Sequence, residues 1–184
     1  MSTTTARVTA VSSNGTYSFS KPNRAGITLL AGLGVEDDVH AGETIKHQFR
    51  MTYEPELLNL RQVHLMHEEL FDELAGKGYA VAPGELGENI STRGIDLLGL
   101  PTGTLLNLGE QAIVEVTGLR NPCSKINTFR PGLLNEMFEI DLATGDFTFK
   151  SGIMGVVRQG GRVRPGDAIG VDLPAGPHRP LERV

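Results

Sequence analysis

Glycine recurs along the whole chain, and this one feature limits the folds that the chain can adopt. Twenty-three of the 184 residues are glycine, whereas average usage is about 7%. Each glycine inside a helix costs about 1 kcal/mol relative to alanine, so a helix-rich bundle is a poor expectation. Such a chain turns often, or brings its backbone close to another group.

The pattern between these glycines predicts short strands and one main helix. We expect strands over 6–12, 17–20, 27–30, 44–47, 60–63, 104–108, 112–117, 153–158 and 168–173. Leu65, Met66, Leu70, Phe71 and Leu74 recur at helical spacing and predict a helix, which Gly76 and Gly78 would end. A second, short helix is expected over 131–139. Many short strands with few helices indicate a mainly β protein, with a closed or nearly closed barrel.

The length favours a single domain over residues 1–184, since domains hold roughly 100–200 residues. We expect its core over about 6–173 and a loose tail over 174–184, where three prolines fall. The net charge of −5 argues against a nucleic-acid partner, because general binding to phosphates needs a positive excess. No apolar run is long enough to span a bilayer, and the N-terminus lacks a signal-peptide core. A cytoplasmic protein without membrane contact is the expectation.

The lone cysteine, Cys123, lies in a polar turn sequence between Arg120 and Lys125. A single cysteine forms no internal disulfide, which fits a reducing compartment. Nearby positive charge stabilises a thiolate, the form that acts as nucleophile and as soft-metal ligand. A buried structural cysteine is the alternative, and the residues alone leave both open.

Two histidine-containing segments are further candidates. Residues 38–47 bring Asp38, His40, Lys46 and His47 together, a set that suits an anion or a metal, with a polar surface loop as the alternative. His64 and the histidine three residues later, at the start of the predicted helix, have a spacing that zinc ligands can use. The full H-E-x-x-H arrangement is missing, so a solvent-facing pair is favoured.

The segment 83–94 is rich in glycine and hydrogen-bonding side chains, Asn89 and Arg93 among them. Its glycines permit close backbone approach to a ligand, and an arginine can bind an oxyanion. It matches neither the phosphate-binding P-loop nor the dinucleotide fingerprint. A double turn between two strands is the alternative.

Together these segments resemble a MOSC domain, the C-terminal module of molybdenum-cofactor sulfurases, in its small stand-alone bacterial form. The resemblance covers roughly residues 6–173. It rests on Asp38-x-His40-Ala41-Gly42, Gly87-Glu88-Asn89-Ile90-Ser91-Thr92-x-Gly94, Arg120-Asn121-Pro122-Cys123-x-Lys125, Gly152–Val157 and Val163-x-Pro165-Gly166-Asp167. The second and third motifs are specific as a pair. The resemblance implies a β-barrel of the pyruvate-kinase-barrel-like type with a few flanking α-helices.

The resemblance also implies a molybdenum cofactor, molybdopterin, with Cys123 supplying a thiolate to the metal and the pterin dithiolene supplying further sulfur. Asn89 matches the family asparagine that reaches the pterin, and Asn121 and Met154 match positions lining the pocket. Candidates to neutralise the cofactor phosphate, chosen by chemistry rather than by motif, are Arg61, Arg93, Arg120, Lys125, His40, Lys46 and His47.

The chain departs from the family pattern in two places. Many stand-alone members have His-Gly-Gly where this chain has His40-Ala41-Gly42, and a glycine is usual where Asp37 precedes Asp38. No aminotransferase-like domain is present in the sequence, so no pyridoxal phosphate chemistry is expected. No electron-transfer domain is present either, so a separate redox protein is the expected partner.

By resemblance, the first hypothesis is an oxidoreductase that reduces small N-hydroxylated compounds, such as hydroxylaminopurines and amidoximes. The second is a sulfur carrier, in which Cys123 takes a persulfide from a sulfur donor and delivers it to a metal–sulfur centre. A non-catalytic cofactor carrier is a third. A zinc hydrolase using His64, His67 and either His40 or His47 is the most distant alternative.

Overall fold

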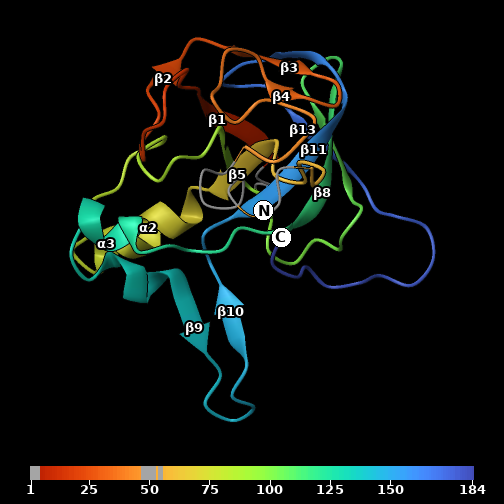
Figure 1. The fold of residues 1–184 in the computed structure, drawn as a ribbon. Helices are drawn as coiled ribbons and strands as arrows, with labels where there is room; N and C mark the ends of the chain where they lie inside the picture. The colour runs from red at the N-terminus through yellow and green to blue at the C-terminus, as the bar shows by residue number, and fades with distance from the viewer. Residues whose placement is uncertain (1–4, 47–52, 54–55) are drawn as a thin grey trace.

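A strongly curved eight-stranded sheet forms the centre of the computed structural model, which describes residues 5–46, 53 and 56–184 (Figure 1). Its spatial order is β13 (Ile169–Asp172), β7 (Leu105–Leu108), β8 (Ala112–Leu119), β11 (Ile153–Gln159), β5 (Val63–His67), β6 (Ile90–Arg93), β1 (Arg7–Ser12) and β2 (Asn23–Arg24). Neighbouring strands pair antiparallel, except for β5 and β6, which run parallel. The prediction of a mainly β fold with few helices is confirmed.

The two ends of this sheet approach one another without forming a continuous ladder. An isolated bridge joins Arg7 of β1 to Ala168, just before β13. The Val8 amide donates to the Asp167 carbonyl at 2.8 Å, and the Gly166 amide donates to the Val8 carbonyl at 2.8 Å. The structure is therefore a barrel-like sheet that is nearly, but not completely, closed.

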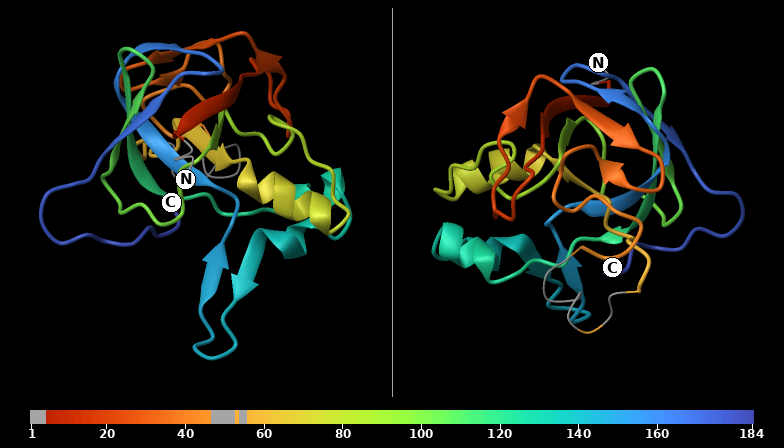
Figure 2. Two further views of the ribbon diagram at one scale, coloured as in Figure 1. Left: turned by 180° about the vertical axis from the view of Figure 1, so that it is seen from behind. Right: turned by 45° about the horizontal axis from the view of Figure 1, so that its top comes forward.

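Two smaller sheets extend the fold. β12 (Gly161–Val163), β3 (Ile27–Leu30) and β4 (Gly34–Val35) form a three-stranded sheet. β9 (Phe138–Ile140) and β10 (Phe147–Phe149) form a hairpin that projects from the body (Figures 1 and 2). Leu142, at the tip of this hairpin, is 95% exposed.

The helical elements gather on one side of the sheet: α2 (Glu69–Gly76), α3 (Lys125–Phe129) and the 3-10 helix η1 (Leu133–Met137) (Figure 1). One apolar cluster fills the curved sheet and includes Leu65. A second lies among the helices and includes Met66. Since successive strand residues point to opposite faces, β5 contributes to both clusters.

This double burial explains the main error of the sequence prediction. The helix expected to include Leu65 and Met66 begins only at Glu69, and the two residues lie in β5. A strand buried on both faces shows no alternation, so its apolar run merges with that of the following helix. The strand expected over 17–20 is also absent, and the strand that follows β1 in the chain and pairs with it is Asn23–Arg24.

The segment 174–184, for which a loose tail was expected, returns to the sheet. The Leu119 amide at the end of β8 donates to the Glu182 carbonyl at 2.7 Å, and the Val184 amide donates to the Leu119 carbonyl at 3.3 Å. Leu181 packs against the cluster inside the sheet. Within the described residues, no helix has the length and apolar character needed to cross a membrane.

Candidate functional site

A cavity of about 980 Å³ lies where β5, β11 and α3 meet the loops around residues 17–21, 40–46 and 87–89. Nine of the predicted site residues line it: His40, Lys46, Arg61, Asn89, Arg120, Asn121, Cys123, Lys125 and Met154. Segments far apart in the sequence thus converge on one hollow around the single cysteine.

One predicted residue within the described part of the chain does not line the cavity. Arg93 lies on β6 and pairs instead with Asp72 at 2.8 Å and with Glu68 at 3.4 Å, so the expectation that it binds cofactor phosphate is not supported by its position. His47 lies outside the described residues. Arg93 was a candidate because it belongs to the glycine-rich segment 83–94. The composition of that segment does not show the direction in which each side chain points.

The lining also contains Lys21 and His64, which the sequence analysis did not place in the site. Lys21 sits in a segment without periodicity and carried no signal. His64 was considered only as a zinc ligand beside His67. Because both lie on β5, three residues apart, they point to opposite faces of the sheet. Within the described residues no three His, Cys, Asp or Glu side chains cluster as a metal site.

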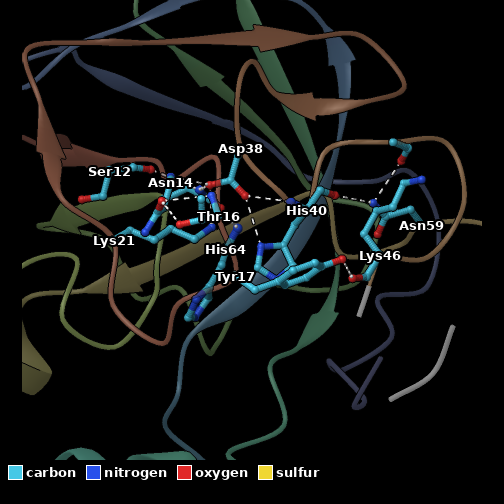
Figure 3. Close-up of polar contacts among 12 residues, drawn as sticks. Ser12, Asn14, Thr16, Tyr17, Lys21, Asp38, His40, Lys46, Asn59 and His64 are labelled. Carbon is cyan, nitrogen blue, oxygen red and sulfur yellow. Dashed lines mark hydrogen bonds and ion pairs between the residues drawn. The ribbon is translucent and has the colours of Figure 1, made fainter. Parts of the chain in front are cut away.

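Asp38 is the hub of the polar network behind the cavity wall (Figure 3). Its Oδ2 accepts from Lys21 Nζ at 2.8 Å, from Asn89 Nδ2 at 3.1 Å and from the Asn14 amide at 3.2 Å. Its Oδ1 accepts from the amide and Nδ1 of His40, at 3.0 and 3.1 Å. One buried carboxylate therefore fixes four segments of the chain relative to each other.

The charges of this network are strongly coupled. Burial alone would raise the pKa of Asp38, but the hydrogen bonds from His40 and the charge of Lys21 outweigh it and hold that pKa well below its usual value. Burial lowers the pKa of Lys21, and Asp38 offsets this only in part. Breaking one partner of such a buried pair leaves an uncompensated charge and is strongly destabilising.

Both the nitrogen and the oxygen of the Asn89 side-chain amide form hydrogen bonds to other segments of the cavity wall. Its Nδ2 donates to Asp38 and to the Ser12 carbonyl, each at 3.1 Å, and its Oδ1 accepts from the His64 amide at 3.2 Å. Both amide hydrogens are thus bonded within the protein. Only acceptor capacity on Oδ1 remains for a ligand.

Glycines let this loop approach its neighbour closely. Gly87 has φ +85°, and a Cβ there would lie 2.5 Å from the Phe19 carbonyl oxygen. Between Gly87 and Asn89, the carboxylate of Glu88 is fully buried and accepts from the Gly84 amide at 2.6 Å and from Ser91 Oγ at 3.2 Å. Burial raises the pKa of Glu88. The glycine-rich segment therefore forms part of the cavity wall through hydrogen bonds within the protein. Its amino-acid composition alone could not show this structural role.

Cys123 is partly exposed at the cavity, between the end of β8 and α3. The guanidinium of Arg120 lines the same cavity. Burial lowers the pKa of Arg120, while the charge of Cys123 and then that of Glu88 act in the opposite direction. Arg120 Nη1 is buried and has no hydrogen-bond partner among the described residues, so the protein leaves this donor unsatisfied.

The donor set fits an anionic group that binds sulfur. The described lining contains five lysines and arginines and no aspartate or glutamate, although the whole chain carries a net charge of −5. Cys123 supplies the sulfur ligand and Arg120 Nη1 an unsatisfied donor. These features match molybdopterin, which carries a phosphate and a dithiolene-bound metal.

Comparisons with solved structures agree with this fold. The YuaD protein from Bacillus subtilis has a TM-score of 0.71 and 26% identity, and the match covers 91% of this chain and 95% of that one. YiiM from Geobacillus stearothermophilus has a TM-score of 0.63 and 20% identity, with 91% and 75% covered. YiiM from Escherichia coli has a TM-score of 0.60 and 21% identity, with 94% and 73% covered. The two YiiM proteins support the fold alone.

No curated protein sequence matches the chain. The family model of the MOSC domain matches residues 35–170. This span includes the loop of Asp38 and His40, the wall of Asn89 and the turn of Cys123, which the structure brings to one cavity. Because the match takes in most of the chain and these three motifs, the chain belongs to the MOSC domain family.

Proposed function

We propose that the protein binds the molybdenum cofactor through Cys123 and reduces small N-hydroxylated compounds. The MOSC family is linked to molybdenum cofactor binding. The observation that carries the proposal is the lining of the cavity, in which the described residues contribute five cationic side chains, no carboxylate and the only cysteine of the chain. The resemblance that implies N-hydroxyl reduction rests on the same motifs.

In this proposal each side chain of the cavity has a distinct task. Cys123 Sγ binds the metal, and Arg120 adds its positive charge to the same wall and offers the cofactor Nη1, which has no partner among the described residues. Lys46, Arg61 and Lys125 neutralise the phosphate.

Asn121 and Met154 complete the wall of the cavity. When bound, the cofactor supplies a redox-active metal that exchanges two electrons with the substrate. The electrons come from a separate electron-transfer protein.

Elemental analysis of freshly purified protein from a molybdate-fed host tests the first half of the proposal. We expect about one molybdenum per chain in the wild type and almost none in Cys123→Ala. Arg93→Gln is the matched control, because this cation is paired outside the cavity and its removal should leave the metal content unchanged. Loaded protein should then reduce an aromatic amidoxime when dithionite-reduced methyl viologen supplies electrons.

Other results would redirect the assignment. Absence of molybdenum from wild type and variant alike contradicts the proposal, and a persulfide on Cys123 in the mass spectrum would then favour the sulfur carrier. Bound cofactor without turnover would favour a cofactor carrier. Both alternatives use the same positive surroundings of Cys123, so the metal content and the mass must be measured on the same preparation.

A further inference from the structure

His40 faces the cavity with one ring nitrogen already fixed by the protein. Its Nδ1 lies 3.1 Å from Asp38 Oδ1 (Figure 3), and the side chain of Asp38 is only 2% exposed. Because an ionised carboxylate only accepts hydrogen bonds, Nδ1 must carry the hydrogen. The atom that can exchange a proton with a ligand in the cavity is therefore Nε2.

The surroundings hold this ring in one orientation. The backbone amide of His40 binds the same carboxylate oxygen at 3.0 Å. The ring of Tyr17 meets that of His40 edge to face, with centroids 5.7 Å apart, and the Tyr17 hydroxyl donates to the Lys46 carbonyl at 3.0 Å. At the same time the side chain of His40 stays 32% exposed, so it is ordered but accessible.

Two other proton-carrying groups of the wall, those of His64 and Lys21, are committed to partners within the protein. His64 is 4% exposed and its Nε2 lies 2.7 Å from the Ser151 carbonyl, to which it must donate. Lys21 is paired with Asp38 at 2.8 Å. A histidine oriented by a buried carboxylate is the usual arrangement for general acid–base catalysis, and in this cavity His40 has it.

We propose that His40 is the catalytic proton donor for the N–O bond cleavage, with Asp38 as its positioning residue. This inference rests on the proposed function. The reduction R–NH–OH + 2 e⁻ + 2 H⁺ → R–NH₂ + H₂O breaks the N–O bond. The electrons come from a low-potential one-electron reductant. One proton passes from His40 Nε2 to the leaving oxygen, which departs as water, and the second reaches nitrogen from solvent.

Asp38 serves this step by position. Its hydrogen bond to Nδ1 fixes the imidazole ring of this lining residue and leaves Nε2 as the ring nitrogen that is not bonded to Asp38. Lys21 and Asn89 hold the other carboxylate oxygen, so the carboxylate cannot rotate away. Within the three-residue motif Asp38-x-His40, the aspartate thus holds the cavity wall together and the histidine donates the proton.

The test uses cofactor-loaded His40→Ala with benzamidoxime as substrate and reduced methyl viologen as electron donor. We expect the molybdenum content to stay at the wild-type level, while kcat falls about 100-fold or more with a smaller change in KM. Added imidazole should restore part of kcat, which a purely structural role of His40 would not allow. His178→Ala changes an exposed histidine that is not part of the cavity lining. This variant is the matched control and should keep full activity.

A second readout needs no cofactor. Nitrogen-15 NMR of the apoprotein should show hydrogen on Nδ1 of His40, and Asp38→Asn should weaken that preference. Wild-type turnover with undiminished kcat in His40→Ala, or the Nε2–H tautomer in the apoprotein, would overturn the assignment alone. A wild type that binds molybdenum without reducing benzamidoxime would overturn the reductase proposal and the role of His40 with it.

Discussion

The resemblance to the MOSC family places a glycine where this chain has Asp37, and the backbone at this position gives a physical reason for a glycine. Asp37 has φ +59°, a left-handed conformation that costs most L-residues about 1–2 kcal/mol. Aspartate tolerates it better than most, because its short side chain can bond locally. The strained turn places Asp38, the hub of the cavity wall, in its buried position.

We expect Asp37→Gly to be close to wild type in stability and Asp37→Ala to be about 1 kcal/mol less stable than Asp37→Gly. Urea denaturation of the two variants measures this difference. The neighbouring exposed Glu36 is the control, because its φ is not positive. There alanine should be the more stable of the pair, since glycine loses more backbone entropy on folding. If Asp37→Ala were more stable than Asp37→Gly, the explanation from the left-handed backbone would be wrong.

His64 predicts how stability depends on pH. Burial keeps the pKa of His64 well below its ordinary value in the folded protein, while the unfolded chain takes up a proton near pH 6.5. The unfolded state therefore binds more protons below that pH, and the free energy of unfolding falls as the pH falls. The wild type should lose about 1.4 kcal/mol more per pH unit than His64→Gln between pH 6 and pH 5.

Urea midpoints at several pH values measure this slope. Glutamine is the chosen replacement because its side-chain amide can still donate to the Ser151 carbonyl, as His64 does. His178→Gln, at an exposed position, should keep the slope of the wild type. Equal slopes in the wild type and His64→Gln would mean that His64 is protonated in the folded state.

At the scale of elements, sequence patterns predicted best where a strand has one buried face. The burial of β8 alternates along its length, and β7 and β8, both predicted as strands, pair antiparallel. The pattern failed at β5, which is buried on both faces and merged with α2. It also missed β6, because Ile90–Arg93 fell in a segment interpreted as a ligand-binding loop or as a double turn between two strands.

The candidate site was predictable in part for the same physical reason. Short motifs such as Asp38-x-His40 and the turn of Cys123 are local, so resemblance finds them. Their convergence on one cavity depends on strand order, and Lys21 joins them only through a contact 17 positions away in the sequence. Arg93 shows the converse, because residues of the segment 83–94 belong to different faces once β6 forms.

The whole molecule is held together by contacts between distant segments, and its C-terminal residues take part in them. Besides the bonds to Leu119, the Thr102 amide donates to the Arg179 carbonyl at 2.9 Å. Arg61, a lining residue of the cavity, donates from Nη1 to the Val184 carbonyl at 3.1 Å. The segment 179–184 thus braces the end of β8 and one wall of the site.

Deletion of residues 179–184 should therefore destabilise the whole fold. Three lost backbone hydrogen bonds, at about 1 kcal/mol each, predict a loss of about 3 kcal/mol, or a fall in Tm of roughly 6–12 °C. Differential scanning calorimetry measures it, and Leu142→Ser, which changes an exposed hairpin tip, should leave Tm unchanged. An unchanged Tm after the deletion would contradict this prediction. It would mean that the barrel-like sheet is equally stable without the hydrogen bonds from residues 179–184.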